Sequence, residues 1–167
     1  MIELSEAQRK LCRTQADIFE ASTRLSTSGS AVFVRRFMRS DLARRMDEGG
    51  FPFESNSLEQ IIETVEASYA AGPYGSETYS ANEMHWMGFF YRCWCCATGS
   101  SSKSAYAAIG ARELRRLYYP YHSLDPTQAV ERVMEAKRMS REQGIERGVE
   151  VLKVIRNIRV PVSRQRI

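Results

Sequence analysis

The sequence is poor in the residues that build disulfide frameworks, metal centres and nucleophilic triads. Its 167 residues include only two histidines and four cysteines, and three of the cysteines fall in the run Cys93-Trp94-Cys95-Cys96. Cysteines this close together cannot easily pair with one another, so we expect no disulfide framework. Because four ligands at metal-binding spacing are not evident, we predict reduced, buried thiols and no metal or cofactor.

Long apolar runs are missing as well. No stretch approaches the ~20 apolar residues that a membrane span needs. The acidic start of the chain, residues 1–6, has no continuous apolar segment of the kind that marks a secretory signal. We therefore expect a soluble, cytoplasmic protein without a membrane partner. A hydrophobic content of 43% and an aromatic content of 10% exclude a wholly disordered chain.

Helical spacing of apolar residues runs through nearly the whole chain, and no run of alternating strand residues is present. The predicted helices cover residues 4–25, 31–47, 57–71, 80–99, 100–109 and 111–119, then a segment that begins at Asp125-Pro126 and a weak repeat over 145–155. We predict an all-α fold: a single-domain bundle of about six helices over residues 1–138, followed by a basic helical extension or tail over residues 139–167.

The predicted helix over residues 80–99 is the most apolar one. Ser80 and Glu83 fit a capping box at its start, and both tryptophans, Trp86 and Trp94, lie within it. We expect this helix to be central and buried on nearly every side. Gly88 would cost ~1 kcal/mol against alanine at an exposed helical position, so it predicts close packing of another helix there.

The basic residues are concentrated at the C-terminal end. The formal net charge is +4, but residues 137–167 carry nine basic and three acidic residues, which leaves 15 basic and 17 acidic residues before them. Such asymmetry is typical of a segment that meets nucleic acid or an acidic partner, and a solvated helix end is the alternative. The nucleic-acid candidates are basic residues of this tail: Arg141, Arg147, Lys153, Arg156, Arg159, Arg164 and Arg166.

Residues for nucleophilic catalysis are scarce. His85 and His122 are the two available bases, and no G-x-S-x-G elbow is present. We interpret His85 as a core histidine bonded to a backbone carbonyl and His122 as a polar anchor at a helix end. The serines and the lysine of Ser101-Ser102-Lys103 could hold an anion at a helix start, but an ordinary serine cap is the favoured interpretation.

Four segments carry a family resemblance. They are Phe33-Val34-Arg35-Arg36-Phe37-Met38-Arg39-Ser40-Asp41-Leu42-Ala43, residues 83–94 with the pattern W-x-G-x-x-Y-R-x-W, Ser101-Ser102-Lys103-Ser104-Ala105-Tyr106, and residues 117–126 with Tyr121-His122-Ser123-Leu124-Asp125-Pro126. In this order they resemble small proteins of gut Firmicutes and Actinobacteria that are labelled as antitoxins of toxin–antitoxin modules. The resemblance covers roughly residues 30–133 and leaves out the C-terminal extension.

The resemblance implies a non-enzymatic protein that binds and neutralises a cognate toxin, and that represses its own operon by binding operator DNA. Nine aromatic or polar residues are the candidates for contact with this partner: Trp86, Tyr91, Arg92, Trp94, Ser101, Ser102, Lys103, Tyr121 and His122. Tryptophan and tyrosine are included because they dominate interface hot spots.

Two other functions stay open from the sequence. One is a nucleic-acid-binding regulator that uses the basic tail and the Arg-rich helix over residues 31–47. The other is a small enzyme, which requires that Tyr91, Arg92, Lys103 and His122 converge in one cleft.

Overall fold

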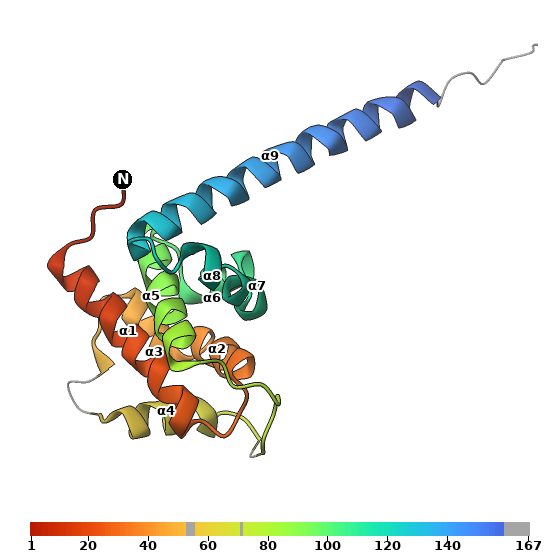
Figure 1. The fold of residues 1–167 in the computed structure, drawn as a ribbon. Coiled ribbons are helices and arrows are strands. Elements are labelled where there is room, and N and C mark those ends of the chain that lie inside the picture. Colours follow the sequence, from red (N-terminus) through yellow and green to blue (C-terminus); the bar gives the residue numbers. More distant parts are fainter. Residues whose placement is uncertain (53–55, 71, 159–167) are drawn as a thin grey trace, which may run out of the picture. The chain divides into compact units, whose positions relative to one another are not determined.

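The computed structural model describes residues 1–52, 56–70 and 72–158, and every regular element in these ranges is a helix. In chain order the helices are α1 (Glu6–Leu25), α2 (Ser30–Met38), α3 (Asp41–Asp47), α4 (Leu58–Ala67), α5 (Ala81–Thr98), α6 (Ser102–Ala108), α7 (Ala111–Arg116), α8 (Tyr118–Tyr121) and α9 (Pro126–Ile158) (Figure 1). The predicted all-α class is confirmed. None of these helices is long and apolar enough to cross a lipid bilayer.

The predicted count of about six helices is wrong, since the described residues form nine. The predicted helix over 31–47 is divided after Met38, because the Ser40 hydroxyl accepts a hydrogen bond from the Ala43 amide and so caps a new helix. The predicted helix over 111–119 is likewise divided into α7 and α8. In contrast, the segments after Asp125 and over 145–155 form the single helix α9.

The chain divides into two compact units. The first is Met1–Glu131 and contains α1 to α8 with the start of α9; the second is Arg132–Ile167, which the structure describes as far as residue 158. The predicted extension from residue 139 lies within this second unit. Three of its predicted basic contacts, Arg159, Arg164 and Arg166, lie outside the described residues.

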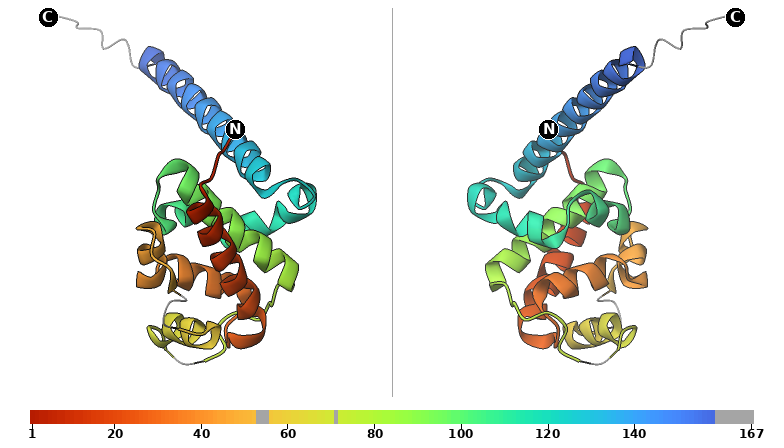
Figure 2. Two further views of the ribbon diagram at one scale, coloured as in Figure 1. Left: turned by 90° about the vertical axis from the view of Figure 1, so that its left-hand side faces the viewer. Right: turned by 90° about the vertical axis from the view of Figure 1, so that its right-hand side faces the viewer.

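The first unit is organised around α1 and α5, which lie side by side (Figure 1 and Figure 2). At Gly88 of α5 the two backbones approach so closely that a Cβ atom there would lie 2.7 Å from the Gln15 carbonyl oxygen and 2.8 Å from the Ala16 Cα. The predicted close approach of a second helix at Gly88 is therefore confirmed. The predicted Ser80–Glu83 capping box is also present at the start of α5.

Aromatic side chains fill the space between α1 and its neighbours. Phe19 of α1 meets Phe33 and Phe37 of α2 edge to face, with ring centroids 5.9 and 5.1 Å apart, and all three are fully buried. Edge-to-face packing contributes about 0.5–1.5 kcal/mol per pair beyond the burial itself. These contacts hold α2 against α1 and so place the Arg-rich segment of the sequence.

Glu66 of α4 fastens the loop that follows α1. Its carboxylate accepts hydrogen bonds from the hydroxyls of Ser26 and, at 3.1 Å, Ser28. Although partial burial acts to raise it, these hydrogen bonds hold the pKa of the Glu66 carboxyl below its ordinary value. The loop leads to Gly29, which is the N-cap of α2 and provides no side-chain cap. The hydroxyl of Ser30, the first residue of α2, accepts a hydrogen bond from the Tyr79 amide.

Candidate functional site

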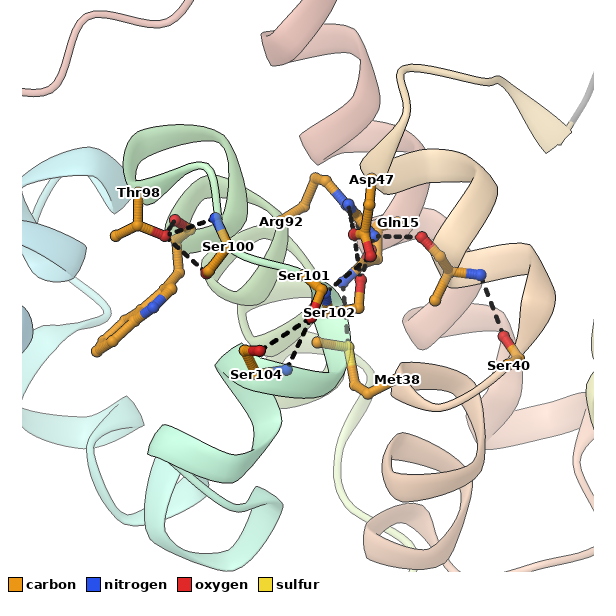
Figure 3. Close-up of polar contacts among 12 residues, drawn as sticks. Gln15, Met38, Ser40, Asp47, Arg92, Thr98, Ser100, Ser101, Ser102 and Ser104 are labelled. Atoms are coloured by element: carbon orange, nitrogen blue, oxygen red, sulfur yellow. Dashed lines mark hydrogen bonds and ion pairs between the residues drawn. The ribbon is translucent and has the colours of Figure 1, made fainter.

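Arg92 of α5 lies at the centre of a buried polar cluster (Figure 3). Its Nε donates to Gln15 Oε1 at 2.8 Å, its Nη1 to Asp47 Oδ1 at 2.6 Å and its Nη2 to Ser102 Oγ at 2.8 Å. Asp47 also accepts from the Ser102 amide at 2.9 Å. The side chains of Arg92 and Asp47 are 1% and 14% exposed, so each charge depends on the other for compensation.

This Arg92 cluster joins four helices. Gln15 belongs to α1, Asp47 to the end of α3, Arg92 to α5 and Ser102 to the first turn of α6. Ser101, the residue before Ser102, caps α6, because its hydroxyl accepts a hydrogen bond from the Ser104 amide at 3.2 Å. The predicted serine cap is therefore confirmed. Two polar residues of the segments that carry the family resemblance, Arg92 and Ser102, cross-link the helices of the first unit.

A hollow of about 550 Å³ borders the Arg92 cluster, and Cys96 lines it. A hydrogen bond with the Cys12 thiol and the nearby Arg92 cation lower the pKa of the half-buried Cys96 thiol to about 7. Burial instead raises the pKa of the Cys95 thiol to about 12. The predicted burial of the thiols is confirmed for Cys12, Cys93 and Cys95. Cys96 differs from them, because a thiol with a lowered pKa beside open space can react as a thiolate.

The four side chains of the predicted enzyme site do not converge. Arg92 lines the hollow of about 550 Å³, whereas His122 lines a separate hollow of about 400 Å³. Tyr91 is buried and donates its hydroxyl to the Ile109 carbonyl at 2.7 Å. Lys103 is exposed on α6. The geometry therefore assembles no acid–base or nucleophilic set from these four residues.

The hollow of about 400 Å³ is aromatic. Trp86 meets Tyr118 edge to face at 5.7 Å between centroids, and His122 stacks on Tyr118 at 4.8 Å. His122 Nδ1 lies 3.2 and 2.9 Å from the carbonyls of Tyr118 and Tyr119, so it donates to the end of the α7–α8 segment. The predicted role of His122 as a polar anchor is confirmed. Trp86 Nε1 is buried without a hydrogen-bond partner.

The nine predicted partner contacts thus differ in accessibility. Five of them are buried in the described structure: Trp86, Tyr91, Arg92, Trp94 and Ser102. The other four are exposed or half-buried: Ser101, Lys103, Tyr121 and His122.

His85 is not the core histidine that the sequence predicted. Its side chain is 43% exposed, and its Nδ1 lies 2.9 Å from Glu20 Oε2 and 3.9 Å from Asp17 Oδ1 on α1. The prediction was wrong because the neighbours of His85 in the sequence, Met84 and Trp86, are buried while His85 points from another side of α5. The spacing of Asp17 and Glu20, three residues apart on one predicted helix, was the signal that could have shown paired carboxylates.

An exposed apolar stripe follows α9 through its second half. It consists of Ile145, Val149, Leu152 and Ile155, at spacings of four, three and three, so the four lie on one face of the helix. Their exposed fractions are 57%, 45%, 66% and 48%. We refer to these four residues as the α9 stripe.

Charged side chains flank the α9 stripe unequally. Glu142, Glu146 and Glu150 follow one another at a spacing of four and form an acidic row beside the stripe. Arg141, Arg147 and Lys153 are six residues apart, which turns each roughly 120° from the one before. Arg156 lies four residues after Leu152 and seven after Val149, so it adds one more cation on the face of the stripe itself. Over the described part of α9, the predicted nucleic-acid contacts are thus spread around the helix.

No protein-family model matches this chain, and no curated protein or solved structure is significantly similar to it. The resemblance to antitoxin-labelled proteins stays a prediction, carried by the four segments quoted above. The function is therefore inferred from the geometry of the first unit and of α9.

Proposed function

We propose that this chain is a non-enzymatic, antitoxin-like protein that binds and neutralises a cognate toxin, and that it does so with the α9 stripe. The observation that carries the proposal is a face of four exposed aliphatic side chains on one helix. An amphipathic helix that lays such a face into an apolar groove is a common mode of protein recognition, with anchors spaced three and four residues apart.

The energy of this contact comes from burial. Complete burial of an exposed aliphatic side chain of this size is worth about 1.5–3 kcal/mol. The residues of the α9 stripe are about half exposed, and each therefore offers a part of that value to a partner. Four such anchors can dominate an interface, since a few residues carry most of the binding energy.

The acidic row beside the stripe specifies the partner's chemistry. Glu142, Glu146 and Glu150 would border any groove that holds the stripe, so a groove rimmed with lysine or arginine is complementary. A toxin that acts on nucleic acid carries basic residues around its cleft for the phosphates. Seating the acidic row there would block that cleft, which gives a physical route to neutralisation.

Two glycines on the same side of α9 support close docking. Gly144 and Gly148 stand one turn apart, and a Cβ atom at either would meet no atom within 4 Å. Among the described residues nothing requires glycine at these positions, yet each costs about 1 kcal/mol of helix stability against alanine. A partner whose backbone packs closely against α9 would explain why glycine stands at both positions.

Co-expression with the product of the neighbouring gene tests the proposal. We expect that product to arrest growth alone, this chain to relieve the arrest, and the two proteins to co-purify. A neighbour that is harmless by itself, or two proteins that do not co-purify, would remove the antitoxin function.

Matched variants tie the test to the α9 stripe. Leu152→Glu should abolish relief of growth arrest, because it places a charge in the apolar groove. Val154→Glu is the control, since Val154 is 53% exposed on the same helix but turned roughly 160° from Leu152. Strongly salt-dependent binding of DNA or RNA that both variants keep would instead favour the nucleic-acid-binding regulator.

A further inference from the structure

Two carboxylates and a histidine gather on the surface of the first unit, where α1 and α5 lie side by side. Asp17, Glu20 and His85 each offer one ligand atom, and these atoms all lie within 4.8 Å of one another. From this group we propose that the chain binds a divalent transition-metal ion of the zinc class. The proposal does not depend on the toxin-binding function, because none of the three residues belongs to α9.

The backbone holds the three ligands in place. Asp17 and Glu20 are three residues apart on α1 and so project from the same side of that helix. His85 comes from α5, three residues before Gly88, where a Cβ atom would be only 2.7 Å from the Gln15 carbonyl oxygen. Because α1 and α5 touch backbone to backbone within one turn of His85, the distance between the ligand-bearing segments is fixed before an ion arrives.

The ligand atoms need only small side-chain movements to meet one ion. Zinc bonds of about 2.0–2.2 Å to nitrogen and carboxylate oxygen place tetrahedral ligand atoms about 3.3–3.6 Å apart. His85 Nδ1 is already 2.9 Å from Glu20 Oε2 and 3.9 Å from Asp17 Oδ1. The side chains of Asp17, Glu20 and His85 are 56%, 49% and 43% exposed, so rotation about their side-chain bonds is unobstructed by burial.

The donor set selects the class of ion. Magnesium and calcium take oxygen ligands, whereas a neutral imidazole nitrogen suits zinc and its neighbours in the first transition row. One histidine with two carboxylates leaves positions of the ion open. His85 also lines the hollow of about 400 Å³, which it shares with Arg13 and His122, and water there can complete the coordination.

The alternative is that His85 makes only an ordinary polar contact with its two carboxylate neighbours. Such a contact produces the same distances without a bound ion. Titration with a metal salt therefore separates the two interpretations.

Isothermal titration of the full chain with zinc chloride is the test. We expect one ion per chain, and His85→Gln should weaken the affinity by roughly tenfold or more, which corresponds to about 1.4 kcal/mol of binding free energy. Glu20→Gln should weaken it similarly. Both residues are half exposed, so circular dichroism of the variants should match the parent chain.

Two controls make each outcome decisive. Asp41→Asn changes an exposed carboxylate of α3 outside the group and should leave zinc binding unchanged, and so should Cys96→Ser. The proposal is overturned if the parent chain takes up no zinc, if His85→Gln and Glu20→Gln bind as tightly as the parent, or if Cys96→Ser alone removes binding, which would place the ion at the thiols.

Discussion

At the scale of single residues, Arg92 is one of the largest fully buried side chains in the described chain. A guanidinium that is 1% exposed is compensated by Asp47 and held in position by Gln15 and Ser102. Since three other helices supply these partners, the side chain acts as a cross-link of the first unit. Its position in a motif does not by itself indicate contact with a ligand.

Replacing Arg92 by methionine tests that role. Arg92→Met leaves the carboxylate of Asp47 nearly buried without its cation, and breaking a buried pair in this way costs about 3–5 kcal/mol. We expect the free energy of unfolding, measured with urea, to fall by that amount. The double variant Arg92→Met/Asp47→Asn should recover part of the loss. A change below about 1 kcal/mol for the single variant would show that the cluster is not a cross-link.

Cys96 should be the most reactive thiol near neutral pH. A hydrogen bond with Cys12 lowers its pKa below the ordinary thiol value, so more of Cys96 than of Cys95 is thiolate near neutral pH, and this fraction falls as the pH drops. Alkylation with iodoacetamide, located by mass spectrometry, should modify Cys96 first, with a rate that rises at a lower pH than for an ordinary thiol. Cys96→Ser serves as the control. Equal modification of Cys95, whose pKa is about 12, would contradict this assignment.

Sequence reasoning reached some residues of the site and missed others for a physical reason. Helical periodicity and capping patterns are local, so they located Trp86, Gly88 and the Ser101 cap correctly. The partners of Arg92 and His85 are separated from them by up to 77 positions along the chain. No local pattern specifies such contacts, because they depend on how α1 and α5 pack.

At the scale of elements, glycine has opposite consequences in α5 and α9. Gly88 faces the α1 backbone, whereas Gly144 and Gly148 face open space. Replacing glycine by alanine should therefore destabilise the chain in α5 and stabilise the helix in α9.

Alanine substitutions test this contrast. Gly88→Ala should lower the free energy of unfolding by about 1–3 kcal/mol, because the added methyl group overlaps the Gln15 carbonyl. Gly144→Ala/Gly148→Ala should increase helix stability by about 1 kcal/mol per site. Urea unfolding checks the first change, and thermal unfolding followed by circular dichroism checks the second. If the α9 substitutions destabilise the chain, the two glycines are required within the molecule itself.

Helix boundaries show where local patterns are insufficient. The chain breaks between α2 and α3 because the Ser40 hydroxyl caps a new helix, and no glycine or proline marks the position. The apolar spacing continues across the break, so it predicted one helix. The segment after Asp125 and the weak repeat over 145–155 were predicted separately, but no proline lies between Pro126 and residue 158 and the helix α9 continues through both. The all-α class was predictable because helical periodicity extends across nearly every segment.

At the scale of the whole molecule, the distribution of charge limits the possible partners. The C-terminal excess predicted from the sequence includes three arginines outside the described residues. On the described part of α9, the basic side chains and two further exposed valines, Val151 and Val154, spread around the helix. The glutamates form one row and the α9 stripe forms another. An apolar row beside an acidic row favours a groove on a protein, and not a nucleic-acid phosphate backbone, as the binding partner of α9.

The central claim is that α9 binds a partner protein through its exposed aliphatic stripe. The most direct measurement is the affinity of the purified full chain for the product of the neighbouring gene, compared between Leu152→Glu and Val154→Glu. We predict that Leu152→Glu weakens binding by roughly tenfold or more while Val154→Glu stays within about twofold of the parent. Equal losses for both variants, or no loss for Leu152→Glu, would contradict the claim.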